Sequence, residues 1–188
     1  IVADRFGNSA ALMAVVLVLA VPLAFLGGVA LAIRRDSRFD RWTMNAIILF
    51  KALPAFVLAI GLILLFSTTV FPILPAVSLL DPEISPLLQP IYLVLPALTL
   101  ILIVAPFLLR LVRSAMIETL EAEYVAAARL RGIPEWRIIW THAVPNALVP
   151  VIQGIALTSR LLLGGGLIVE VVFSYPGIGN ALNSAIEM

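Results

Sequence analysis

Four long apolar runs constrain the fold of this chain more than any other feature of its sequence. They cover residues 9–33, 46–71, 91–109 and 146–173. Each is close to the length of about 20 residues that a helix needs to cross a bilayer core of roughly 30 Å. The runs are apolar on all sides, and an open sheet would leave unpaired backbone groups in lipid. The sequence therefore predicts an all-α integral membrane protein, a polytopic helical bundle with four transmembrane helices.

Composition supports a membrane protein and excludes several other classes. Hydrophobic residues make up 62% of the chain and charged residues 12%, and the mean hydropathy is +1.13. The net charge of +1 provides no broad basic surface, so we expect no nucleic-acid partner. There is no cysteine and the only histidine is His142, so we expect no disulfide, no thiolate nucleophile and no metal site.

The distribution of arginine predicts the orientation of the helices. The first connection carries four arginines (Arg34, Arg35, Arg38 and Arg41) and the third, residues 110–145, carries five, whereas residues 72–90 contain no Lys or Arg. Because Lys and Arg concentrate on the cytoplasmic side, the first and third connections should lie inside the cell and the second outside. Both ends of the chain, including residues 174–188, then lie outside. We expect a fragment of a longer subunit with about six transmembrane helices.

The third connection has the pattern of two amphipathic helices joined by a sharp corner, and we call residues 115–142 the elbow. The first helix is expected to run through residue 130, with one face formed by Met116, Leu120, Tyr124 and Ala127. The second helix is expected to present Trp136, Ile139, Trp140 and Ala143 on one face before Pro145 breaks it.

Gly132 should form the corner, because it suits a left-handed helix end, and Pro134 suits the first turn of the next helix. The pattern alone is compatible with a surface that docks a partner and with a helix pair lying in the lipid interface.

The spacing of Ala126, Ala127 and Ala128, then Gly132, then Pro145 thirteen residues later resembles the cytoplasmic loop of permease subunits of ATP-binding-cassette importers. The sequence departs from that family pattern at Ala126, where Glu is usual, and at His142, where an aliphatic residue is usual. Both departures resemble the peptide-transporter branch. Later segments, NALVPVI from Asn146 and VEVVFSYPGIGNAL from Val169, are similar to the B-type subunit of dipeptide and oligopeptide importers.

This resemblance implies a permease subunit of the bacterial inner membrane, part of the pathway for peptides or a similar small solute. It also implies the partners: a second permease subunit in a heterodimer, two ATPase subunits that hold ATP and Mg, an extracytoplasmic binding protein, and membrane lipid. The substrate stays open, since related permeases are associated with nickel, glutathione and sugars as well as peptides. The resemblance assigns ATPase coupling to Glu123, Tyr124, Ala126, Ala127, Ala128, Arg129, Gly132 and Pro145.

Two further groups of residues are candidates for the transport pathway. Arg160 is the one charge deep in a predicted span, and it either faces the pathway or makes a structural ion pair or hydrogen bonds to carbonyls near Gly164. The glycines of the run, Gly164, Gly165 and Gly166, either hinge this helix or allow close helix contact. Tyr175, Pro176 and Gly177 predict a turn that either borders an outer gate or only connects two helices.

Enzymatic functions find little support in the sequence. There is no G-x-x-x-x-G-K-[ST] phosphate loop and no H-E-x-x-H motif, so we expect no cofactor here and ATP hydrolysis on another chain. The competing class is a secondary transporter or channel driven by a gradient. Such a protein would need carboxylates within its spans, and Glu170, near an outer end, is the only one.

Overall fold

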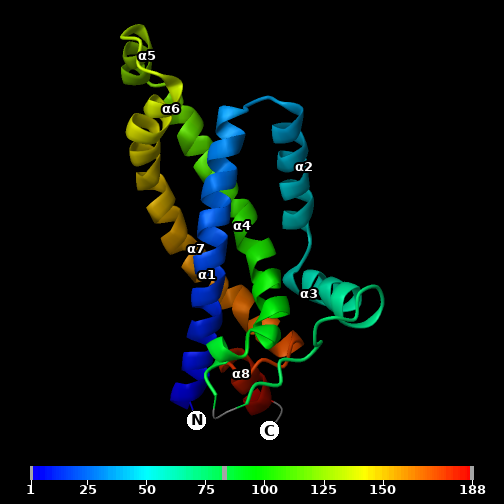
Figure 1. The fold of residues 1–188 in the computed structure, drawn as a ribbon. Coiled ribbons are helices and arrows are strands. Elements are labelled where there is room, and N and C mark those ends of the chain that lie inside the picture. Colours follow the sequence, from blue (N-terminus) through cyan, green and yellow to red (C-terminus); the bar gives the residue numbers. More distant parts are fainter. Residues whose placement is uncertain (1, 82–83, 187–188) are drawn as a thin grey trace. The chain divides into compact units, whose positions relative to one another are not determined.

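The computed structural model describes residues 2–81 and 84–186, and within them the chain forms helices and no strand (Figure 1). This confirms the all-α fold class. The elements in chain order are α1 (Val2–Ile33), α2 (Arg38–Ala52), α3 (Ala55–Ile63), η1 (Leu64–Thr68), η2 (Pro86–Leu88), α4 (Pro90–Leu120), α5 (Glu123–Leu130), α6 (Glu135–Arg137), η3 (Ile138–Ala143), α7 (Val144–Val172) and α8 (Ile178–Ile186).

Three helical stretches in the described residues are long and apolar enough to cross a membrane: Ala3–Ile33, Pro90–Leu120 and Glu135–Val172. A fourth span exists only if α2 and the helix after it are counted together. The span expected over residues 46–71 is therefore not one continuous helix, because the chain leaves the helix at Leu53 and Pro54. Pro54 has an extended backbone, and proline disfavours a helical conformation in the residue before it.

The chain divides into two compact units. The first contains Ile1–Ala20, Phe50–Val104 and Ser159–Met188, and the second contains Val21–Leu49 and Ala105–Thr158. Helices α1, α4 and α7 each contribute residues to both units. The elbow lies wholly in the second unit, and the outer turn lies in the first.

Small side chains allow close helix packing in the core of the second unit. A Cβ atom on Gly28 of α1 would lie 2.6 Å from the Cβ of Val112 and 2.9 Å from the carbonyl oxygen of Leu109, both on α4. Such contacts between helix backbones are typical of membrane bundles, where packing and not water exclusion drives association. The buried cluster around this contact contains Val29, Ala32, Val112, Ala115, Met116, Ala143, Val144, Ala147 and Val151.

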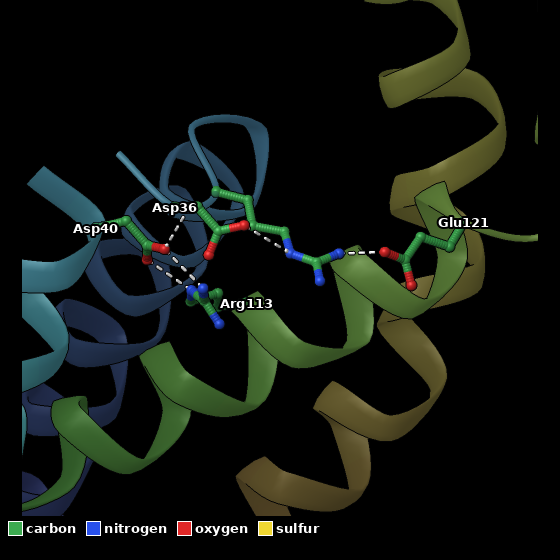
Figure 2. A network of polar contacts seen from close by, with 5 residues as sticks. Asp36, Asp40, Arg113 and Glu121 are labelled. Carbon is green, nitrogen blue, oxygen red and sulfur yellow. Dashed lines mark hydrogen bonds and ion pairs between the residues drawn. The ribbon is translucent and has the colours of Figure 1, made fainter. Parts of the chain in front are cut away.

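A polar network in the same unit attaches the start of α2 to the last turns of α4 (Figure 2). Arg113 donates two hydrogen bonds of 2.6 Å, from Nε and Nη2, to the two carboxylate oxygens of Asp40. The Asp40 side chain is only 2% exposed. Arg35 also pairs with Glu121, the residue that follows α4. The buried Asp40–Arg113 pair therefore attaches α2 to α4 close to the start of the elbow.

Sequence reasoning missed Asp40 and used Arg113 only as an orientation signal. One local signal was available, since Ser37 and Asp40 have the spacing of a capping box. The Ser37 hydroxyl accepts a hydrogen bond of 3.1 Å from the Asp40 N–H, and Asp40 Oδ2 accepts one of 3.0 Å from the Asp36 N–H. The pairing with Arg113, which is 73 residues away, leaves no such local pattern.

Candidate functional site

The first arm of the elbow is shorter than the sequence predicted. Helix α4 ends at Leu120, Ala122 is extended with ψ of 148°, and α5 begins at Glu123. The single helix expected over residues 115–130 is therefore wrong, because the chain leaves the helix at Ala122. After this break, the side chains of α5 no longer follow the helical spacing that starts in α4.

The residues buried on α5 are not the ones that the sequence placed on the apolar face. Val125 and Ala128 are buried, whereas Ala127 and Tyr124 are exposed, the latter by 46%. Tyr124 and Ala127 of the predicted face therefore lie on the exposed side of α5, and the buried side is formed by Val125 and Ala128. Ala128 lies inside the elbow, so it supports the shape of the surface without forming part of it.

The corner has the geometry of a Schellman motif. Gly132 has a φ of 74°, the left-handed conformation that its position in the sequence predicts. Its N–H donates to the carbonyl of Arg129 at 2.9 Å, and the Ile133 N–H donates to the carbonyl of Ala128 at 3.3 Å. Pro134 is extended and precedes α6, which begins one residue later than the sequence suggested.

A small apolar core and one ion pair fix the angle of the corner. Val125, Ala128 and Ile138 are buried together with Ile133 packed against them. Arg129 Nε donates to Glu135 Oε1 at 2.7 Å, and Arg129 Nη1 donates to the Leu120 carbonyl at 3.3 Å. The hydrogen bond to Glu135 raises the pKa of the Arg129 guanidinium. Because the pair is exposed, it contributes about 0–1 kcal/mol and mainly sets geometry.

The second arm runs directly into a membrane-spanning helix. Helix α6 passes into the π-helix η3 and then into α7, so residues Glu135–Val172 form one helical stretch. The expectation that Pro145 breaks this helix is wrong. The wider π turn precedes Pro145, whose ring would clash with the carbonyl four residues earlier in a regular α-helix. Asn146 Nδ2 donates to the His142 carbonyl at 2.7 Å and to the Tyr124 hydroxyl at 3.1 Å, which links the two arms.

The elbow exposes large apolar and aromatic side chains. The predicted stripe on the second arm is only partly packed, because Ala143 is buried and Ile139 is half-buried while both tryptophans are exposed. Leu130 is 91% exposed, Trp136 66% and Trp140 51%. Among the predicted coupling residues, Glu123, Ala126, Arg129 and Pro145 are also exposed. A rigid corner with exposed apolar side chains is suited to binding another surface.

The outer turn is packed into the first unit. Tyr175 is fully buried, its hydroxyl donates to the Asn8 carbonyl at 2.8 Å, and Asn8 Nδ2 donates to the Pro176 carbonyl at 2.9 Å. Burial raises the pKa of the Tyr175 phenol, so the hydroxyl stays protonated and available as a donor. The turn is thus fixed to α1 at two points.

Glu170, which sequence reasoning treated only as a carboxylate near an outer end, closes the same turn. Its side chain is 1% exposed, and its Oε2 accepts a hydrogen bond of 2.6 Å from the Gly179 N–H. A Cβ atom on Gly177 would collide with the Glu170 carboxylate. The glycine is therefore required by close approach.

Arg160 lies on the exposed side of α7. Among the residues that the structure describes, it makes no ion pair, and no carbonyl near Gly164 accepts from it. In the glycine run only Gly166 has a close neighbour, since its Cβ position lies 3.3 Å from Met13 Cε, while Gly164 and Gly165 have nothing within 4 Å. Close helix contact therefore explains one glycine of the three.

A family model described as "Binding-protein-dependent transport system inner membrane component" matches residues 20–188. The chain belongs to this family. A protein of Brucella abortus (strain 2308), whose name assigns it to a peptide transport system as a permease, is 36% identical over 187 residues, which cover 98% of this chain and 59% of the relative. The di/tripeptide transport system permease protein of Pseudomonas aeruginosa (strain UCBPP-PA14) is 34% identical over 181 residues, covering 86% of this chain and 54% of the relative.

The glutathione transport system permease protein of Shigella flexneri serotype 5b is 32% identical over 187 residues, covering 100% of this chain and 58% of the relative. The chain thus spans less than two thirds of the length of these relatives. Membership of the family confirms the resemblance to importer permeases, and with the apolar helices it places the chain in the inner membrane as a multi-pass protein.

Proposed function

We propose that this chain forms part of the membrane-spanning region of a permease subunit in an ATP-driven importer. A separate binding protein delivers a peptide or a similar small solute, and two separate ATPase subunits that bind ATP and Mg supply the energy. A second permease subunit completes the pathway as a heterodimer. The family match and the names of the relatives, which refer to peptide, di/tripeptide and glutathione transport, support this proposal.

The observation that carries the proposal is the direct connection of the elbow to the membrane helices. The second arm continues into α7 without a helix break, and Arg129 bonds the first arm to the end of α4. A force applied to the exposed residues of the elbow is therefore passed to two helices at once. A helix pair that only rested on lipid would need no such stiff corner.

The docking role can be tested by placing a charge on the exposed surface. Leu130→Glu should cost little folding energy, because the Leu130 side chain is already 91% exposed. If the elbow binds the ATPase, a carboxylate buried in that apolar interface should reduce co-purification of the ATPase with the intact permease at least tenfold. Ile186→Glu is a matched control, since Ile186 on α8 is 83% exposed and lies outside the elbow. Equal recovery of the ATPase with both variants would refute the docking role.

We also propose that Arg160 lies in the transport pathway, because the residue is exposed and has no ion-pair partner in the described part of the chain. It would attract the carboxylate of a peptide. Arg160→Gln should then raise the substrate concentration for half-maximal uptake of a peptide more than that of its amidated form. Identical shifts for both substrates would refute the proposed contact between Arg160 and the peptide carboxylate. That result would not bear on the energy source.

The energy source needs its own experiment, because a gradient-driven carrier is the alternative. Uptake into vesicles that contain the intact assembly should require internal ATP and persist after a proton ionophore is added. Uptake that stops with the ionophore while ATP is present would support the gradient-driven alternative.

A further inference from the structure

Helix α2 carries a polar hollow that the proposed transport function does not use. Arg38, Arg41, Trp42 and Asn45 line it, with a volume of about 580 Å³. These positions are spaced i, i+3, i+4 and i+7, so they share one face of the helix. All four side chains are exposed, and Trp42 is exposed by 76%.

The hollow is positively charged because its neighbouring acids are already paired. Asp40 is bound by both Arg113 hydrogen bonds, and Arg35 binds Asp36 as well as Glu121. Arg38 and Arg41, by contrast, have no ion-pair partner in residues 2–81 and 84–186. Two uncompensated guanidinium groups, less than one helical turn apart, therefore face the same space.

We propose that this hollow binds the headgroup of an anionic phospholipid of the inner leaflet. Guanidinium groups form bidentate hydrogen bonds with phosphate oxygens, the Asn45 amide can donate to the same group, and an indole ring is favoured at the headgroup level. Arginine concentrates on the cytoplasmic side of membranes, which assigns the start of α2 to the inner leaflet.

The order of side chains along α2 favours a lipid over other anionic partners. One turn beyond Asn45, at i+3 and i+4, lie Ile48 and Leu49, which are 60% and 66% exposed. The face therefore runs from basic through aromatic to aliphatic, as a phospholipid runs from headgroup to acyl chain. A soluble phosphate would not use the aliphatic part, and an acidic protein surface would have to extend into the hydrocarbon to cover it.

The site is held in shape by contacts on the opposite side of the helix. The Ser37 cap fixes the first turn of α2, and the pairing of Asp40 with Arg113 fixes the rotation of that turn. The carboxylate of Asp40 is buried in this pair and not in the hollow. Arg38 and Arg41 are therefore presented on a stiff helix end, which lowers the entropy cost of binding.

Quenching of Trp42 fluorescence by brominated lipids tests the proposal in the intact subunit. Trp42 is kept as the only tryptophan, and the protein is reconstituted in phosphatidylethanolamine vesicles that contain brominated phosphatidylglycerol or, in parallel, brominated phosphatidylcholine. Brominated phosphatidylglycerol should quench Trp42 at a much lower mole fraction. Two arginines, at about 1 kcal/mol each, should make the preference for the anionic lipid about 30-fold.

The arginine variants then assign the preference to the hollow. Arg38→Gln with Arg41→Gln should bring the preference close to one, whereas Arg110→Gln, an exposed arginine on α4, should leave it unchanged. Equal quenching by both lipids in the unmodified site would overturn the proposal, because it indicates ordinary bilayer contact. Absence of quenching by either lipid would also overturn it, because a protein surface must then cover the hollow. Both of these outcomes are measured on the protein that keeps Arg38 and Arg41, so they do not depend on the arginine variants.

Discussion

Replacing Gly132 with valine tests the link between the corner and transport most directly. A Cβ atom there would have no neighbour within 4 Å, so the Cβ itself meets no steric clash. The cost comes from the backbone, since the φ of 74° is left-handed and costs a residue with a Cβ atom about 1–2 kcal/mol. That strain is released only if the corner opens and loses the hydrogen bonds of Gly132 and Ile133 to α5.

The magnitude can be measured by hydrogen exchange at the Ile133 amide. A loss of about 1–2 kcal/mol in local opening free energy corresponds to exchange that is about 5–30 times faster. Gly132→Asn is the matched control, because asparagine tolerates the left-handed region far better than valine. We expect its exchange rate to stay within about threefold of the original.

Transport assays connect this local change to function. In reconstituted assemblies, Gly132→Val should lower solute uptake per ATP hydrolysed while the amount of subunit in the membrane stays constant, and Gly132→Asn should retain most of the uptake. If valine left both exchange and uptake unchanged, the stiff corner would not be needed for coupling. If asparagine were as damaging as valine, the loss would come from side-chain bulk and the backbone argument would fail.

Three further changes test the packing. Arg113→Met leaves the buried Asp40 carboxylate unpaired and should lower the free energy of unfolding by about 3 kcal/mol. Adding Asp40→Leu should restore most of this loss. A thermal melt in which the double variant shows no recovery would contradict the ion-pair argument. Gly28→Ala forces a Cβ atom to 2.6 Å from Val112 and should cost about 1–3 kcal/mol in the same melt, whereas Gly61→Ala, with open space around it, should not. Gly177→Ala should displace the Glu170 carboxylate and increase thiol labelling of a cysteine placed at Ser174, whereas the control Gly7→Ala should not. Adding Glu170→Ala to Gly177→Ala should reverse the increase. Labelling that stays high in this double variant would refute the clash.

Local sequence patterns determined the parts of this protein that depend on neighbouring residues. Unbroken apolar runs indicated membrane helices because a backbone in lipid must satisfy its own hydrogen bonds. Gly132 marked the corner because few other residues adopt its φ of 74°, and Tyr175, Pro176 and Gly177 marked a turn that the structure contains. The family resemblance also came from such local motifs, and the match over residues 20–188 confirms it.

Tertiary structure decided which of these helices continue and which residues pair. The π turn before Pro145 keeps the elbow continuous with α7, although proline alone predicts a break. The extended residue Ala122 exchanges the buried and exposed sides of α5. Asp40 finds Arg113 across 73 residues, and Glu170 is buried by a turn that folds back on it. Helical periodicity describes the faces of one helix, whereas these pairings depend on which helices pack together, and that information is spread over the whole chain.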